Sequence, residues 1–230
     1  MGSFEGQIES VGLDWDDLYV QTTVAKFAHH KEVAAGFNYK LTDEVMREHW
    51  GKGLRRELPI FYGFGEDVSD EKFDELLAAF NALDHKYPKP LQTDTLRFHE
   101  KMKHTGLPLW ILTSHLTDNA IAEVKVAGLA VDDFEFIEGS DVSPAIKPNP
   151  QAFDNVLEKL DKDDIYPNQA VYLGDTLGDF ESSTGAGLQF IGVTSGRTTE
   201  AEFQEAGATV RGSLLAAARL IIPRSTSYDL

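Results

Sequence analysis

From residue 93 onward, short apolar runs alternate with stretches of helical periodicity. Together with an earlier run near the N-terminus, the predicted strands are 8–13, 107–112, 134–137, 170–173 and 189–193. The predicted helices are 93–105, 118–127, 150–160, 182–186, 201–206 and 213–222. Strands that alternate with helices are typical of a parallel sheet covered by helices on both faces. The pattern therefore predicts an α/β fold built on a doubly wound, Rossmann-like parallel sheet.

The stretch 24–87 differs, because it has helical character throughout. Thr42 is suited to cap a helix that starts after it, and 70–83 has apolar residues at the spacing of an amphipathic helix. Pro88 then marks the return to the alternating pattern. We therefore expect an α/β core domain made of 1–20 and 90–230, with 21–89 inserted as a helical domain.

Composition narrows the classes of function. The 230 residues are 42% hydrophobic and 26% charged, which suits a soluble globular protein with a sizeable core. The net charge of −17 argues against binding to nucleic acid, which depends on clustered lysine and arginine. The lack of cysteine excludes disulfides, thiolate catalysis and cysteine zinc sites. No run of about 18 apolar residues occurs, so we expect no membrane span and a cytoplasmic enzyme. The sequence indicates no particular oligomeric state.

Polar residues collect where the predicted strands end. They are Asp14 and Asp16 after the first strand, Thr113 and Ser114 after the second, Asp175 after the fourth with Asp179 one helical turn on, and Lys147 in a loop before a helix. In an open parallel sheet, ligands bind beyond the carboxyl ends of the strands, near the point where the strand order reverses. We therefore expect these side chains to share one site.

Each of these residues also has an ordinary structural interpretation. Asp14 and Asp16 suit an acidic surface turn, and Thr113 suits a helix N-cap. Lys147 suits a solvated loop, and Asp179 suits the first turn of a helix, where the helix dipole favours an acid. Chance does not readily explain why such residues recur at successive strand ends, so their occurrence together favours the functional interpretation.

The chemistry that this set suggests is metal-assisted displacement at phosphorus. Asp14 and Asp175 would offer hard oxygen ligands to Mg²⁺, which also binds phosphate oxygens. One carboxylate could then attack phosphorus and form an aspartyl phosphate, since Mg²⁺ and a lysine neutralise the transferring group. Asp16 is spaced to protonate the leaving oxygen and later to deprotonate the attacking water. The contacts to phosphate would come from the Thr113 hydroxyl, the Ser114 amide and Lys147.

These motifs, in this order, resemble the haloacid dehalogenase-like superfamily, and within it the phosphoglycolate phosphatase and β-phosphoglucomutase-like members. The four loops of that superfamily correspond to Asp14-Trp15-Asp16, Thr113, Lys147 in KPNP, and GDTLGD at 174–179. The resemblance covers the chain before about residue 20 and from 93 to 193. The helical stretch between is placed like the superfamily's helical cap of the first type, inserted after the first loop.

The resemblance implies roles for individual residues. Asp14 would be the nucleophile and Asp16 the general acid and base. Mg²⁺ would be bound by Asp14, the Asp16 backbone carbonyl and Asp175, with Asp179 in or beside its shell. Dehalogenases of the superfamily lack the second aspartate, so Asp16 indicates phosphate chemistry and not carbon–halogen cleavage.

The first loop departs from the superfamily pattern DxDGT, because this chain has DWDDL. Asp17 replaces the glycine, and aspartate adopts strained turn conformations better than most residues, so the loop can survive. Leu18 replaces the threonine, which removes a hydroxyl near the acid–base group. We expect the extra acid at position 17 to raise the pKa values of nearby carboxylates.

The helical insertion would select the substrate, as in similar enzymes. Lys52 and Arg55, in the only cationic cluster of this stretch, are candidates for contacting the leaving group, and a solvated helix face is the ordinary alternative. His49, Trp50 and His115 are further candidates for contacts with the substrate. A small phosphorylated organic acid or sugar phosphate would suit a capped site that excludes water.

The leading hypothesis is therefore a Mg²⁺-dependent phosphomonoester hydrolase that acts on a small phosphorylated metabolite. A sugar-phosphate mutase or a phosphonate hydrolase on the same scaffold is the nearest alternative. A non-catalytic relative that binds a metabolite or partner is a further one, kept open by Asp17 and Leu18. A phospho-accepting receiver domain also pairs a strand-end aspartate with Mg²⁺, but the long insertion after the first acidic loop argues against it.

Overall fold

The computed structural model of the chain describes residues 6–50 and 53–222. It divides into two compact units. The first unit is formed by Met1–Gln21 and Leu91–Leu230, and the second by Thr22–Pro90. Among the described residues, no helix has the length and apolar character needed to cross a bilayer.

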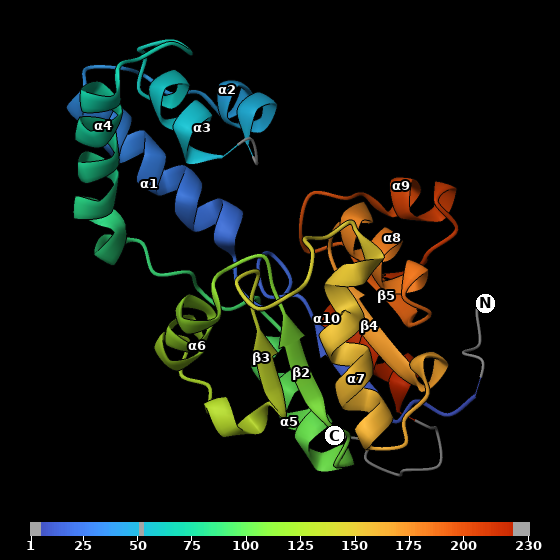
Figure 1. Cartoon of the computed structure of the whole chain (residues 1–230). Coiled ribbons are helices and arrows are strands. Elements are labelled where there is room, and N and C mark those ends of the chain that lie inside the picture. The colour runs from blue at the N-terminus through green and yellow to red at the C-terminus, as the bar shows by residue number, and fades with distance from the viewer. Residues whose placement is uncertain (1–5, 51–52, 223–230) are drawn as a thin grey trace. The chain divides into compact units, whose positions relative to one another are not determined.

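The first unit is built on a six-stranded sheet in which every neighbouring pair is parallel (Figure 1). Its strands are β1 (Ser10–Leu13), β2 (Leu109–Leu112), β3 (Phe136–Glu138), β4 (Ala170–Gly174), β5 (Gln189–Val193) and β6 (Thr209–Arg211). The spatial order β3-β2-β1-β4-β5-β6 reverses at β1, so the sheet is doubly wound as predicted. Strand β6 was not predicted from the sequence, because this edge strand has only three residues and shows little periodicity.

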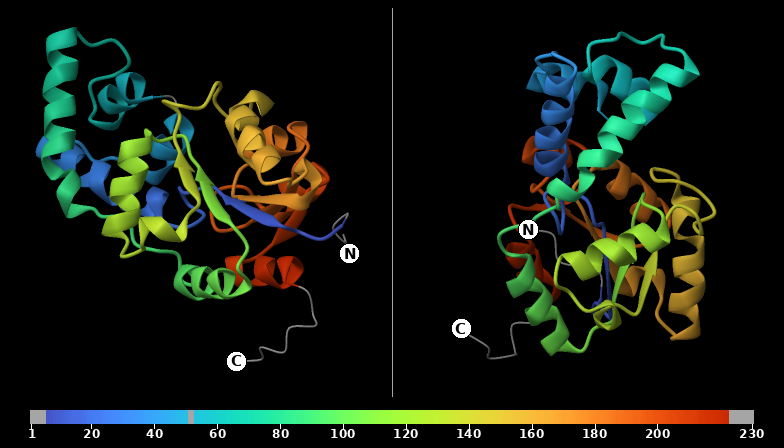
Figure 2. Two further views of the ribbon diagram at one scale, coloured as in Figure 1. Left: turned by 60° about the horizontal axis from the view of Figure 1, so that its bottom comes forward. Right: turned by 90° about the vertical axis from the view of Figure 1, so that its left-hand side faces the viewer.

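Helices cover both faces of this sheet, and the right-hand view of Figure 2 shows α5 and α10 on one side and α7 on the other. The helices are α5 (Thr95–Thr105), α6 (Thr117–Val126), α7 (Asp154–Lys162), α8 (Leu177–Gly185), α9 (Glu200–Glu205) and α10 (Leu214–Ile221). Helix α5 ends at Thr105, as predicted, and Gly106 follows it in the left-handed conformation. Helix α8 starts five residues before the predicted 182, because Thr176 caps it.

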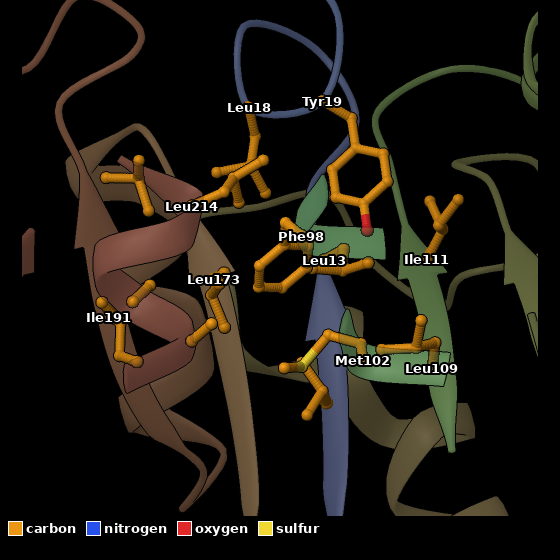
Figure 3. Packing of buried hydrophobic residues seen from close by; sticks show 14 of the residues in the cluster. Leu13, Leu18, Tyr19, Phe98, Met102, Leu109, Ile111, Leu173, Ile191 and Leu214 are labelled. Atoms are coloured by element: carbon orange, nitrogen blue, oxygen red, sulfur yellow. The ribbon is translucent and has the colours of Figure 1, made fainter. Parts of the chain in front are cut away.

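The alternation of side chains along the strands divides the core into two layers. Leu13, Ile111 and Leu173 pack with Phe98 of α5 and other residues of α5, α6 and α10 (Figure 3). Intervening strand residues, such as Trp110 and Tyr172, pack on the opposite face against α7, α8 and α9. Both faces of the sheet are therefore buried, as a parallel sheet requires.

The central strand β1 has small residues on one face, and a neighbouring tryptophan fills the space. A Cβ atom on Gly12 would lie 2.0 Å from the Trp110 ring, so glycine is needed there. The indole Nε1 donates to Ser10 Oγ at 2.8 Å, which satisfies this buried donor. The weakly apolar run of β1 is thus explained by its partner on β2.

The second unit consists of helices α1 (Thr22–Gly36), α2 (Asp43–His49), α3 (Leu54–Phe61) and α4 (Asp70–Leu83). The predicted helix at 70–83 is confirmed, with Leu76 and Phe80 buried in the core of this unit. Thr42 is confirmed as an N-cap, since its side chain accepts from the Val45 amide at 3.4 Å. This unit has a hydrophobic core of its own.

Candidate active site

Most of the predicted site residues of the first unit come directly after β1, β2 and β4, which are neighbours at the reversal of strand order. The register pairs Leu13 with Ile111 on one side and with Leu173 on the other. Asp14 continues this pairing, because its amide donates to the Leu173 carbonyl at 2.9 Å. The sheet therefore brings the acids after β1 and β4 to one edge.

Lys147 joins two of these acids. Its Nζ lies 2.8 Å from Asp14 Oδ1 and 2.6 Å from Asp179 Oδ1. The same ammonium donates to the Tyr172 hydroxyl at 2.9 Å, and that hydroxyl donates to the Leu112 carbonyl at 2.7 Å. Only 9% of the lysine side chain is exposed, so Lys147 belongs to the site and is not a solvated loop residue.

Asp179 is fixed by the start of α8. Its Oδ2 accepts from the Thr176 amide at 3.1 Å and from the Thr176 hydroxyl at 2.6 Å, while its own amide donates to that hydroxyl. This reciprocal capping leaves Oδ1 paired with Lys147. Asp179 is thus a helix-capping acid and a member of the site at the same time.

Asp14, Asp175 and Asp179 are all buried, and their ligand oxygens lie within 4.8 Å of one another. Burial raises the pKa of Asp14 to about 7, and Asp179 and Asp16 add repulsion that Lys147 offsets in part. Burial, reinforced by the charges of Asp14 and Asp179, likewise raises the pKa of Asp175 well above its usual range.

This charge balance fits a divalent cation. The three carboxylates face one lysine, whose pKa is raised because Asp14 and Asp179 outweigh the effect of its burial. Buried carboxylates that are not neutralised are costly, and hard oxygen donors are the ligands that Mg²⁺ prefers. Asp14, Asp175 and Asp179 would therefore hold such an ion.

A glycine makes room for Asp175. A Cβ atom at Gly196, in the loop after β5, would lie only 1.8 Å from Asp175 Oδ2. Only glycine permits this approach of backbone to carboxylate. Gly196 therefore shapes the acidic cluster from the loop after β5, a strand end that supplies no acid to the cluster.

Both departures of the first loop have a structural explanation. Asp17 has a φ of 53°, in the left-handed region where aspartate is tolerated and where the glycine of the superfamily pattern would serve. Its charge contributes to the raised pKa of Asp175, in the direction expected from the sequence. Leu18 is fully buried in the core of the first unit, so packing replaces the hydroxyl of the usual threonine.

Thr113 and Ser114 follow β2, and neither caps α6. Thr113 is buried, and its hydroxyl accepts from the His115 amide at 3.3 Å. Ser114 is exposed. The next residue, His115, contacts Asp16, since its Nε2 lies 2.7 Å from Asp16 Oδ2.

The candidates of the second unit are described within that unit alone. Lys52 lies outside the described residues. Arg55 is bound to Asp70 at 2.6 Å and lies over the Phe73 ring at 4.6 Å, with half of its side chain exposed. Trp50 packs against His30 within the unit. His49 lies 3.9 Å from the neighbouring Glu48. Their roles toward a substrate stay predictions.

Four residues of the site were missed by the sequence analysis, namely Tyr172, Thr176, Glu123 and Gly196. Tyr172 reads as one more apolar residue of β4, and Glu123 as an ordinary acid on α6. Gly196 carries no signal without its contact to Asp175. Thr176 did have a recognisable sequence signal, because a threonine three residues before Asp179 matches the pattern of a capping box.

The fold and these residues define a Rossmann-like α/β protein with an acidic site at the switch point of its sheet. The chain belongs to the haloacid dehalogenase-like hydrolases, whose family description matches residues 13–193. The sequence-based assignment to this family is thereby confirmed.

Solved structures share the fold. A haloacid dehalogenase-superfamily hydrolase of subfamily IA from Geobacter sulfurreducens superposes with a TM-score of 0.73 at 18% identity, over 96% of this chain and 100% of that one. CbbY from Rhodobacter sphaeroides, solved as a variant with xylulose 1,5-bisphosphate, superposes with a TM-score of 0.68 at 23% identity, over 90% of this chain and 95% of that one.

Curated relatives match over part of their length. Pyrophosphatase PpaX of Bacillus velezensis is 27% identical over 138 residues, which is 59% of this chain and 62% of the relative. A phosphoglycolate phosphatase of Rhodobacter capsulatus is 28% identical over 137 residues, 57% of this chain and 58% of the relative. The matched segments thus span less than two thirds of these relatives.

Proposed function

We propose that this chain is a Mg²⁺-dependent phosphomonoester hydrolase that works through an aspartyl phosphate on Asp14. The observation that carries the proposal is the buried group of Asp14, Asp175, Asp179 and Lys147 at the carboxyl edge of the sheet. Asp16 lies two residues beyond the proposed nucleophile, close enough for its charge to affect Asp14. Two carboxylates with separate roles are what nucleophilic and acid–base catalysis need.

In the first step, an Asp14 carboxylate oxygen attacks phosphorus, and the bond from phosphorus to the ester oxygen breaks. Asp16 gives its proton to that leaving oxygen. Lys147 stabilises the ionised form of Asp14 and offsets charge on the transferring group. The Thr113 hydroxyl and the Ser114 amide would hold phosphate oxygens.

In the second step, Asp16 takes a proton from water, which attacks the phosphorus of the aspartyl phosphate. The acyl oxygen–phosphorus bond breaks, inorganic phosphate leaves, and the Asp14 carboxylate is restored. A bound Mg²⁺ would add positive charge for the carboxylates and the phosphate oxygens. Asp14 and Asp175, the Asp16 backbone carbonyl and Asp179 are the residues proposed to hold or support it.

The proposed substrate is a small phosphorylated metabolite. Phosphoglycolate, named in the curated relative, is a small phosphorylated organic acid and belongs in the first panel of esters. We propose that the second unit acts as the cap that selects among such esters, with Lys52 and Arg55 as candidates for contacting the leaving group. We propose that this enzyme acts in the cytoplasm.

The test is release of inorganic phosphate from 4-nitrophenyl phosphate and a panel of small phosphate monoesters. It is run with Mg²⁺, with EDTA, and with Asp14→Asn. We expect metal-dependent turnover that EDTA abolishes and that Asp14→Asn lowers at least about 1,000-fold, because the nucleophile is removed. Circular dichroism of the variant controls for folding.

Turnover that survives in EDTA or in folded Asp14→Asn would contradict the mechanism. Conversion of a sugar phosphate into its isomer without net phosphate release would instead indicate a mutase. No reaction with any ester, in folded protein supplied with Mg²⁺, would favour a non-catalytic relative.

A further inference from the structure

Beside the acidic cluster, three side chains form a chain of contacts from the loop after β1 to α6. Asp16 Oδ2 lies 2.7 Å from His115 Nε2, and His115 Nδ1 lies 3.4 Å from Glu123 Oε1. The other Glu123 oxygen accepts from the indole Nε1 of Trp15 at 2.7 Å. Asp16, the proposed acid and base, is thus followed by an imidazole and a second carboxylate.

Each member of this chain is fixed by a different part of the fold. His115 follows β2, and Glu123 lies two turns into α6. Trp15 is fully buried in the hydrophobic core, so its indole gives Glu123 an anchored partner. The side chains of Asp16, His115 and Glu123 are about a quarter to a third exposed, at 26%, 27% and 30%.

We propose that His115 is a positioning residue for the Asp16 carboxyl, and that Glu123 holds the His115 ring in place. This inference rests on the proposed function. The His115 ring faces a carboxylate at each nitrogen, Asp16 at Nε2 and Glu123 at Nδ1. It holds Asp16 by Oδ2, and the proton is exchanged with the leaving oxygen and with water at Oδ1.

Such support matters because acid–base catalysis depends on orientation. A carboxyl on a loop rotates about its side-chain torsions unless a partner holds it, and misplacement by about 1 Å lowers rates strongly. The first loop of this chain has Leu18 where the superfamily pattern has a threonine, and that leucine is buried in the core. His115 supplies a polar contact to Asp16 from a neighbouring loop instead.

Asp16, His115 and Glu123 also offer ligand atoms that lie within 4.8 Å of one another, so a cation is the alternative to a hydrogen-bonded chain. Asp16 lies 2.7 Å from one ring nitrogen of His115 and Glu123 lies 3.4 Å from the other. A carboxylate at each nitrogen is the arrangement of a hydrogen-bonded chain, which we favour.

Two substitutions of His115 separate its two contacts. The amide nitrogen of His115→Gln reaches the position of Nε2 and keeps a donor toward Asp16. The amide nitrogen of His115→Asn reaches the position of Nδ1 and keeps the contact on the Glu123 side alone. Glu123→Gln is a third variant, since an amide cannot accept at both of its terminal atoms. His104→Asn, on the exposed part of α5, is the matched control.

The measurement is kcat/KM for two esters, 4-nitrophenyl phosphate and glycerol 2-phosphate. An alkoxide needs a proton to leave far more than nitrophenolate does. We expect His115→Asn to lower kcat/KM for the alkyl ester about 100-fold and for the nitrophenyl ester less than about 10-fold, with the loss in kcat. His115→Gln should keep most of the wild-type kcat/KM for the alkyl ester. Glu123→Gln should also lower kcat/KM more for the alkyl ester than for the nitrophenyl ester, but by a smaller factor than His115→Asn.

Equal losses for both esters, or an effect on KM alone, would overturn the inference and assign His115 to substrate binding. If the His115 variants keep the wild-type kcat/KM for both esters while Asp14→Asn is inactive, the positioning role of His115 is overturned and the proposed function stands. Wild-type protein without turnover would overturn both. If His115→Asn does not fold, His115→Gln and Glu123→Gln decide by the same leaving-group comparison.

Discussion

Lys147 holds together carboxylates that would otherwise repel one another. Its contacts with Asp14 and Asp179 are both shorter than 3 Å, at 2.8 and 2.6 Å. Burial and the neighbouring acids still raise the pKa of Asp14 to about 7. One lysine therefore neutralises only part of the negative charge of the three carboxylates. The remaining charge favours a cation at this position.

Gly196→Ala tests the space around Asp175. The new Cβ would lie 1.8 Å from Asp175 Oδ2, so the carboxylate must move. We expect the Mg²⁺ concentration for half-maximal activity to rise about 10-fold or more, because a ligand is displaced. The measurement is phosphate release across a Mg²⁺ titration.

The matched control for that substitution is Gly212→Ala, where a Cβ atom meets nothing within 4 Å. It should leave the Mg²⁺ response unchanged. An unchanged response in Gly196→Ala would show that Asp175 is not needed at its present position, and would contradict its assignment as a ligand.

Individual residues were predictable where they repeat a pattern tied to strand ends. Asp14 and Asp175 were selected in this way, and Lys147 was selected from a loop before a helix. Glu123 and Gly196 could not be, because the contacts of Glu123 with Trp15 and of Gly196 with Asp175 join segments that are separated in the sequence. The tolerance of Asp17 for a left-handed backbone was predictable from its side chain alone.

At the scale of elements, strands were found wherever an apolar run was flanked by turn residues. The edge strand β6 was missed because its three residues are only partly buried. The start of helix α8 was predicted too far along the chain, because its first turn contains Gly178 and a site residue where an apolar stripe would mark a helix. Local function overrode the usual helix signal there.

Helix α1 buries two adjacent histidines in the core of the second unit. His30 Nδ1 lies 3.0 Å from the Tyr62 hydroxyl, and the ring is enclosed by Phe61 and Phe80. Burial lowers the pKa of His30 from 6.5 to about 3, with His29 and Lys26 adding to the effect. The folded protein therefore keeps His30 neutral while the unfolded chain protonates it below pH 6.5.

The sign of the pH dependence follows from this difference. Between pH 6.5 and 3 the unfolded state binds more protons, so stability falls as the pH is lowered and is unaffected above that range. At pH 5 we expect His30 to cost about 2 kcal/mol of unfolding free energy relative to pH 7.5. The measurement is urea unfolding at both pH values.

The control is the double variant His30→Phe with Tyr62→Phe, which removes both polar partners and keeps the aromatic packing. When the pH is lowered from 7.5 to 5, the unfolding free energy of this variant should fall by about 2 kcal/mol less than that of the wild type. Tyr62→Phe alone should keep the wild-type dependence. Equal acid sensitivity in all three proteins would contradict the neutral state of His30.

At the scale of the whole molecule, the chain forms two units with separate hydrophobic cores. The helical insertion was predictable because its continuous helical character differs from the alternating strands and helices around it. The two chain segments that leave the first unit lie side by side: the Gln92 amide donates to the Tyr19 carbonyl at 2.8 Å, and Val20 pairs with Leu91.

Replacing Thr22–Pro90 with a short glycine–serine linker should therefore leave the first unit folded. We expect this variant to hydrolyse 4-nitrophenyl phosphate with Mg²⁺ but to discriminate among small monoesters at least about 10-fold less, because the proposed cap is absent. The measurement is kcat/KM across the ester panel, with circular dichroism as the folding control. An unchanged ranking of esters would contradict the role of the second unit in selection.

The most direct test of the account is to find the phosphoryl group on Asp14. Enzyme with Mg²⁺ is mixed with a phosphate monoester, quenched with acid within one turnover, and mapped by peptide mass spectrometry. We expect an acid-stable, alkali-labile phosphate on the peptide that contains Asp14, and none in Asp14→Asn. Turnover without any phosphorylated peptide, or with the phosphate on another aspartate, would contradict it.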